Sequence, residues 1–178
     1  KEALNRCKAE IENYDELRKN QLISENSKGH ITWRFDYILK YGVSGLKEKY
    51  VDAYNNTNDA KAKEFYEGVI ILLDSLISFN NKHIEHYEKI GNYDLVSRMK
   101  KVPYYPSESF KEAVQSFYMQ HIVVMRENPY GGNGPGRLDY YLWPYLKKDL
   151  DKGIITLEEA KEIIDELFLR FEERLYDM

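Results

Sequence analysis

Cysteine is almost absent from this sequence of 178 residues, which contains only Cys7. A single cysteine excludes an internal disulfide bond and a zinc site built from several thiolates. Proteins without disulfides are typical of reducing compartments, so the sequence predicts a cytoplasmic protein.

Long apolar runs and an excess of one charge are also absent. The longest apolar stretch, from Gly68 to Phe79, is interrupted by Asp74 and is shorter than the ~20 residues that cross a bilayer. The 26 basic and 30 acidic residues give a net charge of −4, and no basic cluster stands out. Neither a membrane nor a nucleic acid is therefore expected as a partner.

The sequence also lacks the alternating pattern of strands, whereas apolar residues recur at helical spacing along most of it. We therefore predict an all-α chain that forms one helical domain over residues 1–178. Gly42 and Gly45 should bend or interrupt the second helix, and Gly91 should end the third. The predicted helices cover about 2–22, 35–54, 60–90, a stretch that follows Ser107, 138–150 and 156–174.

Two patterns suggest metal ligands, but each has a simpler interpretation. The stretch from Asp149 to Ala160 resembles a calcium loop, yet its glycine falls at the fifth position and the twelfth is alanine. A helix end at Gly153 and a capping box that starts at Thr156 explain it better. His83 and His86 lie three residues apart without the further ligands that a metal site needs. We expect no metal site.

The run from Asn128 to Arg137 contains four glycines and two prolines within ten residues. Such a composition specifies a fixed irregular path and allows the backbone to approach a ligand or another segment closely. The run lacks the strand context and the Gly-Lys-Ser/Thr ending of nucleotide-binding loops. A second glycine-flanked turn contains His30, which by physical reasoning alone could face a cleft or the surface.

Taken together, these two segments resemble the glycyl radical enzyme family of pyruvate formate-lyase-like proteins. The stronger match is Gly134–Leu150, which contains Pro-Gly-Arg-Leu-Asp and Trp-Pro-Tyr, followed by Gly153–Ala160. Gly29–Gly42 is similar to the family's Gly-His segment and the helix after it. Phe110–Phe117 is similar to the helix before the glycine-rich loop.

The resemblance implies an enzyme much larger than this chain, in which a glycyl radical is passed to a cysteine that attacks the substrate. Cys7 precedes the matching region, and the family's Arg-Val-x-Gly-Tyr segment is not in the sequence. The resemblance therefore implies a helical portion that packs around a ten-stranded α/β barrel and is inactive alone. It implies no cofactor bound by this segment, a protein glycyl radical in the parent enzyme, and a radical-generating iron–sulfur activase as a partner.

The resemblance also implies roles for individual residues. His30 matches a position that lies near a substrate hydroxyl in dehydratase-like members, and Gly134 matches a second substrate-pocket position. Arg34 departs from the family, which often has an acidic residue there. Structural roles are expected for the remaining motif residues, namely Gly132, Asn133, Pro135, Gly136, Arg137 and Asp139.

The resulting expectation is a lyase or dehydratase segment that lines the pocket for a small, hydroxylated organic substrate. Its main partner would be the remainder of the enzyme, and without that partner a homodimer could cover the apolar surface that the remainder normally covers. The alternative is a free-standing helical interaction module whose glycine-rich loop contacts a protein.

Overall fold

A computed structural model describes residues 16, 19–20, 33–127 and 134–176 of the chain. These residues contain α-helices and no β-strand, which confirms the predicted all-α class. The predicted helix over 2–22 and Cys7 lie outside the described residues, apart from short pieces of that helix. The helices are α2 (Phe35–Asn56), α3 (Ala60–Lys89), α4 (Tyr93–Lys101), α5 (Phe110–Glu127), α6 (Leu138–Asp151) and α7 (Leu157–Tyr176).

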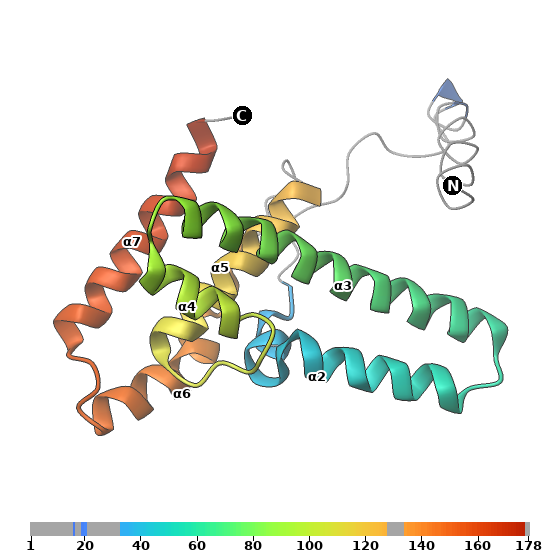
Figure 1. Ribbon diagram of the computed structural model, residues 1–178, viewed down its shortest axis with the longest axis horizontal. Helices are drawn as coiled ribbons and strands as arrows, with labels where there is room; N and C mark the ends of the chain where they lie inside the picture. Colours follow the sequence, from blue (N-terminus) through green and yellow to red (C-terminus); the bar gives the residue numbers. More distant parts are fainter. Residues whose placement is uncertain (1–15, 17–18, 21–32, 128–133, 177–178) are drawn as a thin grey trace.

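Helices α2 and α3 form a long antiparallel pair that projects from the other helices (Figure 1). The Asp59 carboxylate caps α3 by accepting hydrogen bonds from the amides of Lys61 and Ala62. Gly91 ends α3 with φ of 77°, a conformation that costs glycine little. Both ends of this helix agree with the sequence analysis because their signals are local.

Helix α2 is broken at Gly42, which has φ of 66° and ψ of 169°. The break frees the amide of Val43, which donates to the Pro103 carbonyl at 2.9 Å. The amide of Ser44 donates in the same way to the Tyr104 carbonyl at 3.0 Å. The predicted interruption is therefore confirmed at Gly42, while no non-helical angle occurs at Gly45.

Helix α4 was not predicted by the sequence analysis, which assigned no helix to residues 92–102. The side chain of Asn92 caps this helix by accepting a hydrogen bond from the amide of Leu95. Val96 and Met99 are buried on its inner face. With only 9 residues, it offers too few turns for a persuasive periodic signal. Burial of its inner face against neighbouring helices stabilises α4, and a short local pattern does not reveal such burial.

Helix α5 begins after Ser107, as the sequence analysis predicted, and its N-terminal cap is formed by Ser109. The hydroxyl of Ser109 accepts from the amide of Glu112, and the Glu112 carboxylate accepts from the amide of Ser109. This reciprocal pair is a capping box. The amide of Ser107 instead donates to the Leu39 carbonyl of α2 at 2.9 Å.

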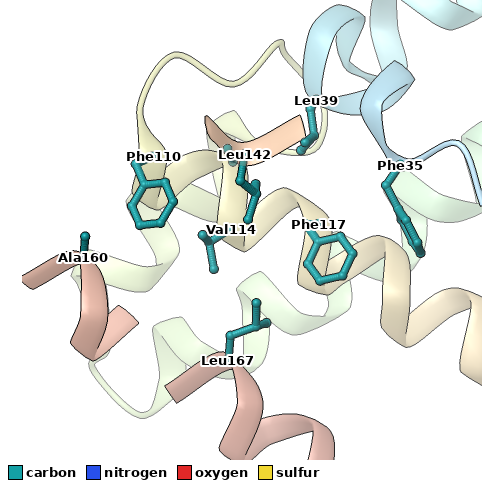
Figure 2. Packing of buried hydrophobic residues seen from close by; sticks show 9 residues of the cluster. Phe35, Leu39, Phe110, Val114, Phe117, Leu142, Ala160 and Leu167 are labelled. Carbon is teal, nitrogen blue, oxygen red and sulfur yellow. The ribbon is translucent and has the colours of Figure 1, made fainter. Parts of the chain in front are cut away.

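The buried apolar residues form two clusters that meet along α5. The first joins the start of α2 to α5, α6 and α7, and eight of its residues are labelled in Figure 2. The second joins the rest of α2 to α3, α4 and α5. Leu39 belongs to the first cluster and Val43 to the second, so the break at Gly42 directs the two halves of α2 into different cores.

The junction of α6 and α7 has the capped geometry predicted from the sequence. Gly153 has φ of 63° and donates its amide to the Leu150 carbonyl. Thr156 and Glu159 exchange hydrogen bonds as a capping box. Asp149 is buried and its carboxylate accepts from the amide of Phe110. The proposed capping explanation is confirmed, since these oxygens serve the helix ends.

Candidate functional site

The starts of α2 and α6 converge over α5 through three aromatic rings. The ring of Phe117 lies 4.8 Å from that of Phe35 and 5.8 Å from that of Tyr141, between centroids. Phe35 and Tyr141 are 6.2 Å apart by the same measure. Figure 2 shows Phe35 and Phe117 side by side. This packing brings together the helices that follow the two motif segments of the sequence.

A groove of about 810 Å³ lies between these two helix starts. We call it the α2–α6 groove. Helix α2 contributes one acidic, one apolar and one basic residue to its wall, whereas the α6 side is mainly aromatic. The lining residues are Asp36, Leu39, Lys40, Arg137, Asp139, Tyr140, Tyr141, Trp143, Pro144 and Tyr145.

Each helix start carries the same internal ion pair. The guanidinium of Arg34 donates to the Asp36 carboxylate through two hydrogen bonds of 2.9 Å. Arg137 and Asp139 repeat this arrangement at 3.0 and 2.9 Å. The sequence analysis expected a structural role for Arg137 and Asp139, and the structure places them in this ion pair. The pair at Arg34 has the same geometry.

The short repeat behind these pairs was missed by the sequence analysis. Residues 34–37 read Arg-Phe-Asp-Tyr and residues 137–140 read Arg-Leu-Asp-Tyr. Arg34 and Arg137 have nearly identical backbone angles, with φ of −83° and −81° and ψ of 63° and 64°. Two helices therefore begin in the same way on either side of the groove.

The ionisation of groove residues follows from these contacts. The hydrogen bond from Arg34 lowers the pKa of Asp36, and that from Arg137 lowers the pKa of Asp139. Both carboxylates are therefore ionised and paired at neutral pH. Burial raises the pKa of Tyr141 and of Tyr145. These hydroxyls remain protonated and can donate hydrogen bonds.

Of the glycine-rich run, the structure describes Gly134–Arg137, and we call this part the glycine-rich corner. Gly134 is half-buried, and a Cβ atom added there would meet nothing within 4 Å. The carbonyl of Pro135 accepts a hydrogen bond of 2.6 Å from the hydroxyl of Tyr141. Gly136 has φ of 65°, which favours glycine. His30, Gly132 and Asn133 lie outside the described residues.

A second hollow, of about 580 Å³, lies between α3, α4, α5 and α7. Its charged groups are already paired with one another. Arg98 contacts Asp94, Lys111 approaches Asp94 at 3.7 Å, and Arg170 contacts Glu166 at 3.2 Å. This hollow contains neither of the predicted motif segments, so the α2–α6 groove is the stronger candidate.

His83 and His121 both have structural contacts. Nδ1 of His83 lies 3.0 Å from the Phe79 carbonyl, and the two rings are 4.5 Å apart. His121 is buried, and its ring centroid lies 4.6 Å from that of Phe171. No group of three or more metal-ligating side chains occurs in the part of the chain that the structure describes. Within the same part, no helix has the length and hydropathy of a membrane span.

The site is suited to binding and positioning, because its described carboxylates are paired with arginines and the hydroxyls of Tyr141 and Tyr145 are protonated. The described residues form an all-α scaffold that presents the starts of α2 and α6 on either side of a groove. The chain belongs to the pyruvate formate lyase-like family, whose model matches residues 4–176. Its relatives and structural neighbours are glycyl radical enzymes, as the sequence motifs predicted.

Individual comparisons give the extent of this likeness. The chain is 28% identical to isethionate sulfite-lyase of Oleidesulfovibrio alaskensis, covering 84% of this chain and 21% of that protein. It is 25% identical to trans-4-hydroxy-L-proline dehydratase of Clostridioides difficile, covering 85% and 21%. A structure concerned with 1,2-propanediol dehydration in Roseburia inulinivorans matches with a TM-score of 0.74 and 32% identity, covering 82% and 20%. The chain thus spans about a fifth of the length of these relatives.

Proposed function

We propose that this chain forms part of the substrate-pocket wall in a glycyl radical lyase or dehydratase that acts on a small hydroxylated substrate. His30 and Gly134 are the proposed pocket residues. The whole enzyme would store its radical on a backbone glycine and would act in the cytoplasm. A radical-generating iron–sulfur activase would produce that radical.

One observation carries the proposal, namely the match to the structure concerned with 1,2-propanediol dehydration over 82% of this chain. The other relatives named above add a hydroxyproline dehydratase and an isethionate lyase. A hydroxylated substrate is the chemistry that these names share.

The chain surface supports a role within a larger assembly. Large apolar side chains are more than half exposed on several helices, among them Phe65, Leu72, Tyr140, Trp143 and Phe168. Exposed apolar surface of this extent is typical of surfaces that another protein segment covers. The remainder of the enzyme is the proposed covering partner. A homodimer of this chain is the alternative.

Within such a pocket, the residues of this chain would bind and orient the substrate. The neutral imidazole of His30 would exchange one hydrogen bond with a substrate hydroxyl. Gly134 would offer backbone groups and space, because nothing lies within 4 Å of its missing side chain. The paired Arg137 and Asp139 would stabilise the helix start beside it. Holding the substrate in one orientation is a large contribution to catalysis.

The test uses the complete product of the gene that encodes this chain, incubated anaerobically with a radical-generating activase. We expect a glycyl radical signal in electron paramagnetic resonance. We also expect turnover of 1,2-propanediol, glycerol, isethionate or 4-hydroxyproline, and none of pyruvate with coenzyme A. His30→Ala should raise KM for the substrate at least tenfold and leave the radical yield unchanged.

The 178-residue chain alone is the matched control, and it should form no radical and turn over no substrate. Turnover of pyruvate with coenzyme A would contradict a hydroxylated substrate. A reading frame that ends at Met178, together with the absence of a radical, would refute the enzyme proposal and support the helical interaction module.

A further inference from the structure

Tyr141 occupies the point at which the glycine-rich corner, α2 and α5 meet. Its hydroxyl donates a hydrogen bond of 2.6 Å to the Pro135 carbonyl. Its ring packs against Phe35, the first residue of α2, and against Phe117 of α5. The side chain of Tyr141 therefore links the glycine-rich corner to the start of α2.

The environment of Tyr141 favours this contact over alternatives. The residue is half-buried in the first core cluster, where an unmade hydrogen bond costs free energy. Burial raises the pKa of its hydroxyl, which therefore stays protonated and donates to the carbonyl. Phe117 is fully buried and has no freedom to move aside. The ring is thereby held in place, and its hydroxyl fixes the position of Pro135.

The corner itself depends on such a tether because its own backbone is permissive. Gly134 and Gly136 flank Pro135, and glycine has the largest conformational freedom of any residue. Pro135 has no amide proton with which to anchor the corner. A hydrogen bond to its carbonyl is therefore an effective way to hold Gly134 in one place.

We propose that Tyr141 is a positioning residue that holds the glycine-rich corner against the first turn of α2 and so sets the width of the substrate pocket. This inference rests on the proposed function for the pocket. Tyr141 acts through Gly134 and need not touch the substrate. Its ring is held by packing in the first core cluster, and its hydroxyl holds the Pro135 carbonyl by a hydrogen bond.

The test compares Tyr141→Phe, which removes only the hydroxyl, with Tyr50→Phe as a matched control. Tyr50 is half-buried against the second core cluster, on the arm formed by α2 and α3. In the 178-residue chain, Tyr141→Phe should speed amide hydrogen exchange in a peptide segment covering residues 134–137 about fivefold to tenfold. The loss of one neutral hydrogen bond allows a change of this size. Tyr50→Phe should leave that peptide unchanged.

In the activated enzyme, Tyr141→Phe should raise KM for the substrate about fivefold to tenfold and change kcat less than twofold, with equal radical yield. A merely structural role would lower the amount of active enzyme and leave KM unchanged. An unchanged rate of amide hydrogen exchange at the corner in Tyr141→Phe would show that the Tyr141 hydroxyl does not hold the corner. Faster exchange with an unchanged KM would overturn its role in the pocket. A wild-type enzyme without turnover of hydroxylated substrates would refute the proposed function alone, because the exchange measurement needs no turnover.

Discussion

The carboxylate of Asp149, near the end of α6, accepts a hydrogen bond of 2.7 Å from the backbone amide of Phe110, the first residue of α5. Asp149 is only 3% exposed, and Phe110 is only 1% exposed. A buried negative charge at a helix N-terminus is stabilised by the free amides and by the helix dipole. The contact joins the end of one helix to the start of another that lies far away in the sequence.

Replacing Asp149 with alanine should lower the free energy of unfolding by about 2–3 kcal/mol, because the buried Phe110 amide loses a charged acceptor. Asp149→Asn keeps a neutral acceptor and should cost about 1 kcal/mol. Asp151→Ala is the control, because its pair with Lys147 is exposed and should contribute no more than about 0.5 kcal/mol. Urea denaturation of the three variants measures these differences. Equal effects of Asp149→Ala and Asp151→Ala would contradict the capping role.

Gly42 should tolerate no side chain. A Cβ atom there would lie 2.4 Å from the Tyr104 carbonyl oxygen and would require a left-handed backbone angle. Gly42→Ala should lower the free energy of unfolding by about 3 kcal/mol or more, from strain and overpacking together.

Gly45→Ala is the matched control, because the added atom would meet only the Cβ of Tyr41 at an ordinary 3.5 Å. Alanine favours helix over glycine, so this variant should be about 0.5–1 kcal/mol more stable than the wild type. Thermal or urea denaturation of both variants measures these differences in stability. A small effect at Gly42 would show that the backbone can regain a regular helix there.

The two described glycines of the corner should respond differently to substitution. Gly136→Ala forces a side chain into the left-handed region and should cost about 1 kcal/mol. Gly134→Ala should change stability by less than about 0.5 kcal/mol, because open space surrounds the position. Urea denaturation measures both effects. A large cost at Gly134 would show that its side-chain position is occupied.

The capping box at the start of α7 should make stability depend on pH. Hydrogen bonds from Thr156, first from its amide and then from its hydroxyl, lower the pKa of Glu159 below its ordinary value of 4.5. The carboxylate therefore stabilises the folded chain fully above pH 4.5. This stabilisation disappears as the pH falls through the lower pKa of the folded state.

Glu159→Gln should therefore lose stability relative to the wild type at pH 7, and the difference should shrink as the pH falls below 4.5. Urea denaturation at several pH values measures it. Glu158→Gln removes a charge from the same helical turn without touching Thr156 and controls for net charge. A constant difference between wild type and Glu159→Gln would contradict the prediction.

Local signals accounted for much of the fold. The helix ends at Gly91 and Thr156 were predicted because each involves residues within a few positions of one another. The family was also predicted from contiguous motifs, and the family match confirms it. The short helix α4 was missed, because nine residues carry little periodic signal and neighbouring helices bury its inner face.

The amino-acid sequence by itself determined the helical class, most helix ends and the family, because hydrophobic spacing, caps and motifs act over a few residues. Only the tertiary structure decided that Phe35 and Tyr141 share a core, that Asp149 caps α5 and that the break at Gly42 receives the carbonyls of Pro103 and Tyr104. These contacts join distant segments, so they depend on how the helices pack. The local helix preferences of the residues do not determine that packing, which is determined by burial of the two apolar clusters.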